Sequence, residues 1–478
     1  MKTDTIAAVA TALSDSGIGI IRVSGEDAIG IVDKIYRNKY GRKTLGAYAT
    51  HTIHYGFIIK NIEEDNRNRT STKEESLDEV MVSVMKAPRS YTKEDTVEIN
   101  CHGGILIVRK ILEEVLKAGA RIAEPGEFTK RAFLNGRIDL ARAEAVMDVI
   151  HARNEFALQS SLKQLKGSVS EIIRRLREDI LYEIAFIESA LDDPEHISLD
   201  GYPEKLEQKL SIIIEETDKL LNTADNGRIL KEGINTAIVG KPNAGKSSLL
   251  NALAGEEKAI VTDIAGTTRD ALEQTVNLGE VTLNMIDTAG IRESDDPVER
   301  IGVQKAIKVM GDADLILYVV DTSVPLDGND EDIFRMIKDR HTLVLMNKSD
   351  LEETVTEDVL RQKLGEHHIP EDEVRILRIS AKKNIGMDML ANLIQDMFFH
   401  GKINYNDEVY ITNMRHKEAL CDARESLLQV RESIRMGMPE DFYSIDLMSA
   451  YASLGRILGE EVGEDLVNEI FGKFCMGK

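Results

Sequence analysis

The stretch GKPNAGKS, residues 240–247, matches G-x-x-x-x-G-K-[ST], the phosphate-binding loop of nucleotide hydrolases. Gly240 and Gly245 let the backbone wrap around a phosphate group with its N–H groups turned inward. Lys246 supplies positive charge to the β and γ phosphates, and Ser247 offers a hydroxyl oxygen to Mg²⁺. This residue pattern predicts a nucleotide site.

The residues on either side of the loop agree with that prediction. Residues 236–239 form a short apolar run typical of a buried strand, and residues 248–253 have the pattern of a following helix. The N-terminus of such a helix favours anions. The alternative is a glycine-rich turn, but the complete motif in this order favours nucleotide binding. The expected nucleotide contacts here are Asn243, Ala244, Gly245, Lys246, Ser247 and Ser248.

A second motif indicates which nucleotide binds. The segment N-K-S-D, residues 347–350, follows the apolar run 342–346. The Asp350 carboxylate can accept from both the N1–H and the 2-amino group of guanine, and adenine lacks this donor pair, so the motif selects GTP over ATP. The segment S-A-K, residues 380–382, follows another apolar run and resembles the last guanine-binding loop of GTPases. The expected contacts are Asn347, Lys348, Ser349, Asp350, Ser380, Ala381 and Lys382.

Two segments between these motifs have the pattern of switch regions. The turn D-T-A-G consists of Asp287, Thr288, Ala289 and Gly290, and it follows the apolar run 281–286. A D-x-x-G turn places its aspartate near Mg²⁺ and its glycine N–H near the γ-phosphate. Thr268 is similar to the switch threonine that ligates Mg²⁺ when GTP is bound, so Ser247 and Thr268 are the expected Mg²⁺ ligands. The alternative for each segment is a polar turn.

The residue that orients the attacking water is not the usual one. Ras-like proteins carry glutamine directly after D-x-x-G, and this chain has Ile291 there, which cannot hold water by a hydrogen bond. Glu299 is the best local candidate for that role. The alternative is a solvated acid, because the run 293–299 is rich in acids.

Composition limits the functional classes. The 478 residues predict several domains, and 60 Lys and Arg against 83 Asp and Glu give a formal charge of −23. This charge argues against nonspecific binding to nucleic acid or anionic membranes, although a local basic face such as residues 174–177 remains possible. Cys101, Cys421 and Cys475 lack metal-like spacing and fit a reducing cytosol. No apolar run reaches about 18 residues, so we expect a cytoplasmic protein without a membrane-spanning helix.

The chain divides into four segments by pattern. Residues 1–135 mix strand-like runs with helical patterns and predict an α+β domain, within which the polar segment 61–76 is expected to be a mobile loop. Residues 136–229 and 401–478 are helical, and the GTPase motifs lie in residues 230–400. The helical patterns cover residues 138–191, 204–221, 410–436 and 443–471.

The two helical flanks need partners for their apolar faces. The simplest solution is one helical domain built from both flanks with the GTPase domain inserted, because the ends of a nucleotide domain usually lie close together. Two separate helical domains and a helical dimer are the alternatives.

Three further motifs resemble one known family. They are P-G-E-F-T at 125–129, R-A-F-L-N-G at 131–136 and the terminal F-G-K-F-C-M-G-K at 471–478. Together with the inserted GTPase motifs, they resemble the MnmE (TrmE) family of tRNA-modification GTPases over essentially the whole chain. The GTPase segment alone would also suit an Era- or Der-like ribosome-assembly GTPase, a switch without covalent chemistry.

The resemblance implies a fold and a function. The fold is mixed α/β and α: an N-terminal α+β folate-binding-like domain that dimerises, a discontinuous helical domain and an inserted Ras-like P-loop GTPase domain. The function is modification of C5 of the wobble uridine, position 34 of certain tRNAs, to the aminomethyl or carboxymethylaminomethyl form. The partners are a second copy and the flavoprotein MnmG (GidA), in a heterotetramer or larger complex, and the one-carbon donor is 5-formyl- or methylene-tetrahydrofolate. Because the chain is acidic, we expect much of the tRNA contact to lie on the partner.

The resemblance also implies roles in hydrolysis. Asn243 matches the asparagine that ligates K⁺, although without the family it could equally be a turn residue after Pro242. The cation does the electrostatic work of an arginine finger after potassium-dependent dimerisation of the GTPase domains. Glu299 matches the water-positioning glutamate. The segment that completes the K⁺ and GTP site is Thr262, Asp263, Ile264, Ala265, Gly266 and Thr267, with Thr262, Ile264 and Thr267 as K⁺ ligands.

A folate site is implied at four positions: Arg22, Glu98, Arg137 and Lys478. Cations suit the carboxylates of folate and an acid suits the pterin N–H groups, but each residue alone could be a surface or structural residue. Cys475 is, with Glu299, a candidate catalytic residue. It could be a nucleophile toward C6 of uracil, a redox or folate-site thiol, or a buried small residue.

Overall fold

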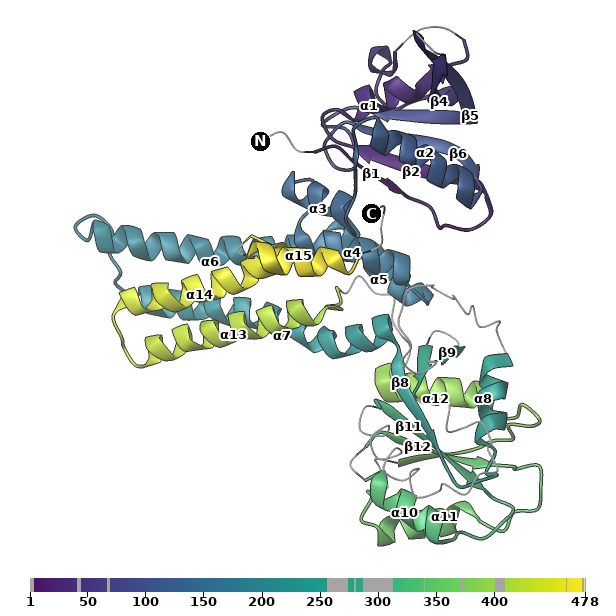
Figure 1. Cartoon of the computed structure of the whole chain (residues 1–478). Helices are drawn as coiled ribbons and strands as arrows, with labels where there is room; N and C mark the ends of the chain where they lie inside the picture. The colour runs from purple at the N-terminus through teal and green to yellow at the C-terminus, as the bar shows by residue number, and fades with distance from the viewer. Residues whose placement is uncertain are drawn as a thin grey trace. The chain divides into compact units, whose positions relative to one another are not determined.

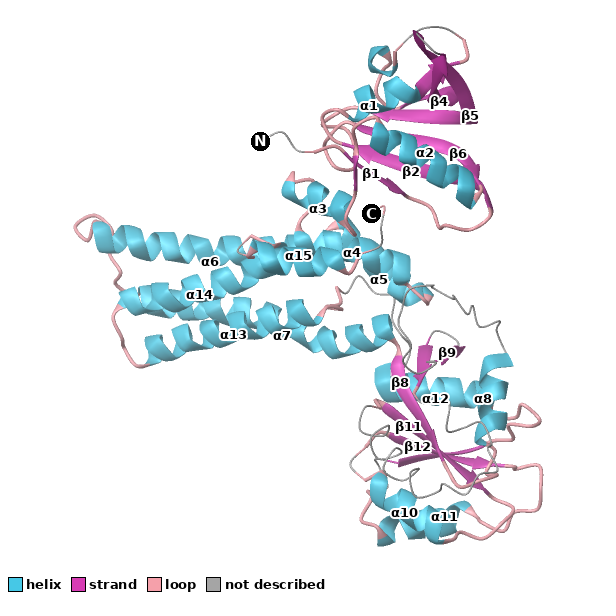
Figure 2. Ribbon diagram, in the orientation of Figure 1, coloured by secondary structure: helices cyan, strands magenta, loops and turns pink. Residues whose placement is uncertain are grey.

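The computed structural model describes residues 4–40, 44–66, 69–255, 274–278, 281–286, 313–338, 340–370, 374–399, 409–460, 462–474 and 477. Figure 1 shows these elements along the chain, and Figure 2 shows them by type. The chain forms two compact units, each described by itself below. Unit 1 comprises Met1–Met147, Gln164–Ala185 and Met448–Lys478, and unit 2 comprises Asp148–Lys163 and Phe186–Leu447. The segment boundaries expected near residues 135, 229 and 400 stay predictions.

Unit 1 contains a seven-stranded sheet of order β3-β4-β5-β6-β2-β1-β7, in which all neighbours are antiparallel except β1 and β7. Helices α1 (Ala28–Ile35) and α2 (Ile105–Lys117) pack on one face of the sheet in a common apolar core (Figure 2). Alternate residues of the strands face this core, as the period of a strand requires. The strands are β1 (Ile6–Val9), β2 (Ser16–Ser24), β3 (Tyr36–Asn38), β4 (Thr52–Asn66), β5 (Arg69–Met85), β6 (Thr96–Gly103) and β7 (Arg121–Ile122), and a 3-10 turn η1 covers Leu45–Ala47.

Within the polar segment 61–76, expected as a loop, residues 61–66 belong to strand β4 and residues 69–76 to strand β5. The two strands pair from Thr52 opposite Val84 to Asn66 opposite Arg69, with one register shift between Ile58 and Ile59. The prediction was wrong because polarity reports solvent exposure, whereas cross-strand backbone hydrogen bonds can hold even a polar ribbon in strand geometry.

Helices of unit 1 come from both ends of the chain. Besides α1 and α2, they are α3 (Glu127–Leu134), most of α4 (Leu140–His151), the first part of α6 (Ser168–Asp192), the last part of α14 (Glu440–Leu458) and α15 (Glu464–Gly472). Leu140 and Met147 of α4 share an apolar core with Val467 and Phe471 of α15. Residues before and after the GTPase motifs therefore pack together in this unit.

The helical pattern 443–471 is broken in the structure. Helix α14 ends at Leu458 and α15 begins at Glu464. Gly459 between them has φ +87°, and a Cβ there would lie 2.8 Å from the Phe133 ring and 2.9 Å from Leu140. Only glycine fits this close approach without strain, so tertiary packing ends the helix where the apolar period continues.

Unit 2 joins the other parts of the two flanks. Helix α7 (Tyr202–Glu232) packs along α13 (Met414–Arg435), and Arg424 forms an ion pair with Asp218. The Ile411 N–H donates to the Thr223 hydroxyl at 3.1 Å. The insertion hypothesis expects this arrangement, because segments on either side of the GTPase motifs lie side by side. Helix α5 (Glu155–Lys166) lies mostly in this unit.

The GTPase part of unit 2 is a six-stranded sheet of order β13-β12-β11-β8-β10-β9. All neighbours are parallel except β9 and β10. Two apolar cores cover the sheet, one with helices α8 and α12 and one with α10 and α11. This is a doubly wound α/β arrangement, and ligands bind at the carboxyl ends of such strands.

The strands and helices of this part of unit 2 have the following bounds. The strands are β8 (Ile234–Val239), β9 (Gln274–Leu278), β10 (Val281–Met285), β11 (Leu315–Asp321), β12 (Thr342–Asn347) and β13 (Val374–Arg378). The helices are α8 (Lys246–Gly255), α10 (Gly328–Met336), α11 (Glu357–Glu366) and α12 (Met387–Phe399). Every residue of β11 is buried, as expected for a central parallel strand. Of the helices that the structure describes, none is long and apolar enough to cross a membrane.

Candidate functional site

The phosphate-binding loop connects β8 to α8 with the backbone that its glycines predict. Gly240 has φ +153° and Gly245 has φ +101°, both in the region that favours glycine. A Cβ at Gly240 would lie 2.5 Å from the Val319 carbonyl oxygen of β11, so the loop turns tightly over the sheet. The Lys246 ammonium donates to the carbonyl oxygens of Gly240 and Lys241, both at 2.8 Å. The loop thus curls around the cation that the motif assigns to phosphate.

One asparagine links three loops of the nucleotide site. The Asn347 side chain, which is buried at the end of β12, donates through Nδ2 to the Ala244 carbonyl oxygen at 2.8 Å. Its Oδ1 accepts from the Ala381 N–H at 3.0 Å. A Cβ at Gly245 would lie 2.1 Å from the same Nδ2, so only glycine fits there. The structure therefore brings the phosphate loop, the N-K-S-D segment and the S-A-K segment together.

Hydrogen bonds favour the ionised form of Asp350, the aspartate expected to bind guanine. The Ser380 hydroxyl donates to Asp350 Oδ1 at 2.7 Å, and the Lys383 ammonium lies 3.6 Å from Oδ2. The hydrogen bond from Ser380 is the main cause that lowers the pKa of Asp350 below its usual value. An ionised carboxylate can accept two N–H donors side by side, which is the pattern that guanine presents.

The other predicted GTP contacts among the described residues differ in exposure. The Ser349 N–H donates to the Ile379 carbonyl oxygen at 3.1 Å. Ala381 is buried, whereas Lys382 and Ser248 are exposed, the latter in the first turn of α8. Asn243 is exposed and has φ +62°, a left-handed conformation that asparagine adopts more readily than most residues. This conformation also suits the turn that was the alternative for Asn243.

A buried aspartate orients the lysine of N-K-S-D. Lys348, with φ +64°, donates to Asp321 Oδ2 at 2.6 Å. Burial opposes the charge of Asp321, but hydrogen bonds from Lys348 and Ser323 outweigh it and lower its pKa. The sequence analysis did not identify Asp321. Its position at the carboxyl end of the apolar strand β11 is the signal that could have found it.

A second unpredicted group anchors the phosphate loop. The Lys241 ammonium donates to Asp330 Oδ2 and to the Pro325 carbonyl oxygen, both at 3.0 Å. The Tyr318 hydroxyl donates to Asp330 Oδ1 at 2.7 Å, and burial, with the Asp330 charge beside it, raises the pKa of Tyr318. Asp330 has no exposed surface. Lys241 occupies an x position of the phosphate-loop motif, and such positions accept many residue types. No sequence signal therefore connects Lys241 to Asp330.

Several predicted site residues lie outside the described residues. They are Thr262, Asp263, Ile264, Ala265, Gly266, Thr267, Thr268, Asp287, Thr288, Ala289, Gly290, Glu299, Cys475 and Lys478. Within the described ranges, no group of three or more His, Cys, Asp or Glu side chains could hold a metal ion. Of the predicted metal ligands, the structure therefore describes Ser247, at the start of α8, and Asn243.

In unit 1, the structure brings two of the four expected folate residues into direct contact. Arg22 on β2 and Glu98 on β6 are cross-strand partners, and both Nε and Nη2 of Arg22 lie 2.9 Å from Glu98 Oε1. The third guanidinium nitrogen, Nη1, donates to the Gly477 carbonyl oxygen at 3.0 Å. The guanidinium carbon lies 5.8 Å from the Tyr91 ring centroid and 5.7 Å from that of Phe128. The C-terminal segment thus reaches the N-terminal sheet.

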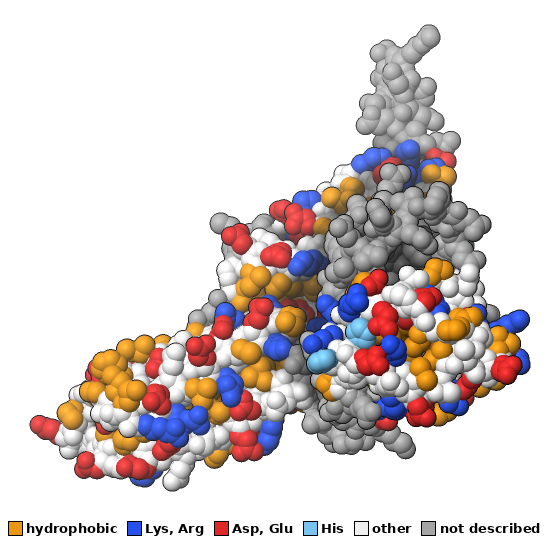
Figure 3. Space-filling view, turned by 90° about the horizontal axis from the view of Figure 1, so that it is seen from below, with side chains coloured by type: hydrophobic (Ala, Val, Ile, Leu, Met, Phe, Trp, Pro, Cys, Tyr) orange, Lys and Arg blue, Asp and Glu red, His pale blue; other side chains and the backbone are white. Residues whose placement is uncertain are grey.

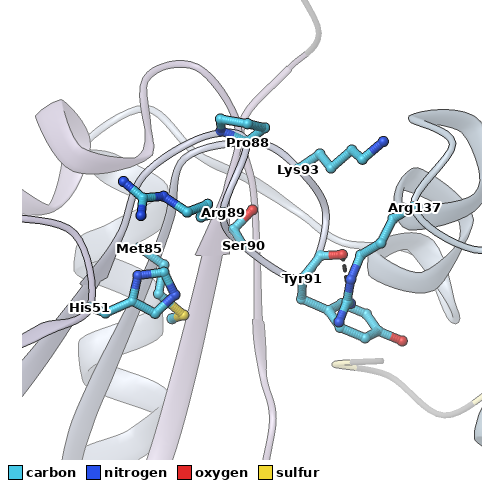
Figure 4. Close-up of a pocket in the computed structure, with 8 residues that line it drawn as sticks. All are labelled: His51, Met85, Pro88, Arg89, Ser90, Tyr91, Lys93 and Arg137. Carbon is cyan, nitrogen blue, oxygen red and sulfur yellow. Dashed lines mark hydrogen bonds between the residues drawn. The ribbon is translucent and has the colours of Figure 1, made fainter.

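Arg137 joins this cluster through Tyr91. Its Nη1 donates to the Tyr91 carbonyl oxygen at 2.9 Å, and its guanidinium lies 4.6 Å from the centroid of the Tyr91 ring (Figure 4). Tyr91 is therefore in contact with both arginines, although the sequence analysis did not single it out. Its place between the two cations is set by the fold and has no local sequence signal.

Comparisons with known proteins match the whole chain. Residues 5–137 match the family model described as the GTP-binding protein TrmE N-terminus, and residues 140–475 match that of the MnmE helical domain. The chain belongs to the MnmE (TrmE) family. The resemblance seen in the sequence motifs is therefore confirmed.

Relatives named "tRNA modification GTPase MnmE" in this family align over the full length. The protein from Lachnoclostridium phytofermentans is 56% identical over 478 residues and 100% of both chains. That from Enterococcus faecalis is 46% identical, over 100% of this chain and 99% of its own. Among solved structures, the FeoB G-domain from Methanococcus jannaschii aligns with 34% of this chain and 97% of its own, at 23% identity and a TM-score of 0.25. A likeness that weak supports no conclusion.

Proposed function

We propose that this chain is a K⁺-activated GTPase that acts in tRNA modification. With the flavoprotein MnmG (GidA), it would modify C5 of the wobble uridine at position 34 to the aminomethyl or carboxymethylaminomethyl form, using a tetrahydrofolate one-carbon unit. Full-length family membership supports this activity over that of an Era- or Der-like switch. The observation that carries the proposal is the Arg22–Glu98 pair beside Gly477, in a chain that also has guanine-specific loops.

The GTP-binding residues fit their proposed roles. Asp350 reads guanine, Lys246 holds phosphate, and Ser247 with Thr268 would hold Mg²⁺. Asn243 stands exposed on the phosphate loop, where its amide oxygen can face a cation, and Thr262, Ile264 and Thr267 would complete a K⁺ site. Such a cation would stabilise negative charge on the transferred phosphoryl group. Glu299 would position the attacking water.

The N-terminal cluster has chemistry that suits a folate. Arg22 and Glu98 expose 17% and 23% of their side chains, so both charges are within reach of a ligand. A carboxylate can accept from pterin N–H groups, and the guanidinium groups of Arg22 and Arg137 can hold carboxylates. When bound, the folate would supply the one-carbon unit. Cys475 lies two residues before Gly477 and Lys478 directly after it, which motivates their proposed places at this cluster.

The partners are part of the proposal. We propose a homodimer through the N-terminal domains, a complex with MnmG and a cytoplasmic location. On the described part of the face that Figure 3 draws, acidic and basic side chains are intermingled. This mixed surface charge and the formal charge of −23 support a complex in which the partner makes much of the tRNA contact.

The test compares wobble-uridine nucleosides in a strain that lacks this gene and carries plasmid copies of it. The wild-type copy should restore the modified nucleoside. Glu98→Gln should fail to restore it while GTPase activity is retained, because the amide cannot keep the charge that holds Arg22 and the pterin. Glu113→Gln, on the exposed side of α2, is the matched control and should behave as wild type.

Two outcomes would contradict the proposal separately. Unchanged wobble nucleosides in the strain without the gene would reject the role in tRNA modification. Full restoration by Glu98→Gln would reject the folate assignment and leave the GTPase assignment untouched.

A further inference from the structure

A cationic pocket adjoins the Arg22–Glu98 cluster in unit 1. It has a volume of about 470 Å³. It lies between His51, just before β4, the loop after β5, and Arg137, three residues after α3. Arg89, Lys93, Arg137 and His51 line it, with Tyr91 as a shared wall (Figure 4). No Asp or Glu is among its lining residues in the described part of the chain. The pocket therefore offers several positive charges and no acid to neutralise them.

The charged groups of the pocket retain hydrogen-bonding capacity. The exposed Arg89 guanidinium makes no hydrogen bond or ion pair with any described residue. Lys93 Nζ uses one donor on the Gly136 carbonyl oxygen at 3.0 Å, and an ammonium has three. Arg137 uses Nη1 on Tyr91, which leaves the other edge of its guanidinium for a ligand.

The backbone around the pocket has the same unusual conformation as the nucleotide loops. His51 has φ +62° and Lys93 has φ +60°. A positive φ is uncommon for a residue with a Cβ, and such residues gather at binding sites. The described residues include six non-glycine residues with a positive φ. Two are His51 and Lys93, and two others, Asn243 and Lys348, belong to the proposed GTP site. The remaining two are Asn384, two residues after Lys382 of the S-A-K segment, and His368, two residues after the end of α11.

Tyr91 connects the pocket to the proposed folate cluster. Its ring lies near Arg22 at 5.8 Å and near Arg137 at 4.6 Å, measured from guanidinium carbon to ring centroid. A ligand with one end at Arg22 and Glu98 would therefore extend past Tyr91 toward Arg89 and Lys93. The pocket is wide and cationic, so it suits an extended chain of carboxylates.

We propose that this pocket binds the γ-linked glutamate chain of a polyglutamylated tetrahydrofolate. The inference rests on the proposed folate function and specifies which form of the cofactor the protein takes. Each added glutamate brings one carboxylate, and Arg89, Lys93 and Arg137 can each pair with one. A monoglutamyl folate, in contrast, can engage only the cations nearest to Tyr91.

The experiment compares the affinity of the full-length protein for monoglutamyl and triglutamyl 5-formyl-tetrahydrofolate by titration calorimetry. Exposed charge pairs each change an equilibrium constant by a few-fold, so the wild type should bind the triglutamyl form roughly tenfold more tightly. This preference should shrink as NaCl is added, because salt screens exposed charges.

The variant Arg89→Gln/Lys93→Gln isolates the pocket. It should bind both forms with equal affinity, within about twofold of the wild-type affinity for the monoglutamyl form, since a neutral amide lacks the charge of a pair. The matched control is Arg109→Gln/Lys110→Gln, which removes the same two residue types from the exposed side of α2 and should keep the full preference.

The outcomes separate this inference from the proposed function. Failure of the wild type to bind either folate would reject the folate function and the inference together. Equal affinity of the wild type for both forms would reject the inference alone. The double variant could lose affinity for the monoglutamyl and triglutamyl forms equally, or it could still prefer the triglutamyl form. Either result would show that the pocket does not bind the glutamate tail. If the double variant keeps the preference but loses binding to tRNA in a filter assay, the pocket is an RNA surface instead.

Discussion

The buried pair of Lys241 and Asp330 predicts a large effect from a very small change, Asp330→Asn. Three donors meet the two carboxylate oxygens: the Lys241 ammonium and the Asp327 N–H at Oδ2, at 3.0 and 2.9 Å, and the Tyr318 hydroxyl at Oδ1, at 2.7 Å. An asparagine has one acceptor oxygen, so its NH₂ group must face a donor on one side. It also leaves the Lys241 charge, which is 8% exposed, without its buried partner. Breaking a buried ion pair in this way costs about 3–5 kcal/mol.

The assay is amide hydrogen exchange of the full-length protein, followed peptide by peptide. Peptides from β8 and α10 should exchange roughly 10²-fold faster or more in the variant, because each 1.4 kcal/mol is a factor of ten. The affinity for GTP should also fall, since the Lys241 carbonyl holds the Lys246 ammonium.

Asp327→Asn is the matched control. Asp327 lies 3.5 Å from the same ammonium but is 51% exposed, and an exposed pair is worth less than about 1 kcal/mol. Its side chain also accepts from the Asn329 N–H as the N-cap of α10, and asparagine caps equally well. If the two variants change exchange equally, then burial does not decide the strength of this pair and our reasoning is wrong.

Four shorter predictions follow from the nucleotide and tRNA sites. Asp350→Asn should weaken GTP binding and shift preference toward xanthosine nucleotides, and unchanged GTP affinity by titration would remove its assignment. GTP hydrolysis should be faster in KCl than in NaCl at equal ionic strength through Asn243, and equal rates would contradict the K⁺ site. Glu299→Ala should lower turnover by roughly 10²-fold with GTP binding intact, whereas a change in KM alone would indicate a binding role. Cys475→Ser should abolish tRNA modification with GTPase activity and folate affinity retained, and wild-type nucleoside levels in that strain would reject a chemical role.

The sequence predicts best what depends on local chemistry. The phosphate loop between β8 and α8 was predicted because its glycines need φ values that few other residues adopt, and both are found at Gly240 and Gly245. The elements that carry the guanine motifs were predicted because long apolar runs such as β12 must be buried.

What the sequence could not predict depends on partners far along the chain. The Arg22–Glu98 pair follows from the register of β2 and β6, and the Lys241–Asp330 pair follows from packing of α10 against the sheet. The segment 61–76 was misjudged for the same reason, since its strand geometry comes from cross-strand bonds. The helix break at Gly459 also depends on a distant residue, because the Phe133 ring packs against this glycine. The spacing of apolar residues along the helix gives no sign of that contact.

Because the Asn347 side chain makes two hydrogen bonds, the loops of the GTPase site are not independent of one another. One amide bonds both the loop predicted to bind phosphate and the S-A-K segment predicted to contact the base. Substitutions on either side of a shared partner do not add independently, so we expect base specificity and phosphate affinity to be thermodynamically coupled. Replacing Asn347 by a residue without an amide side chain should thus change how tightly phosphates are held as well as which base is accepted. A grafted N-K-x-D segment that keeps Asn347 in place would preserve the phosphate loop, and one that moves it would not.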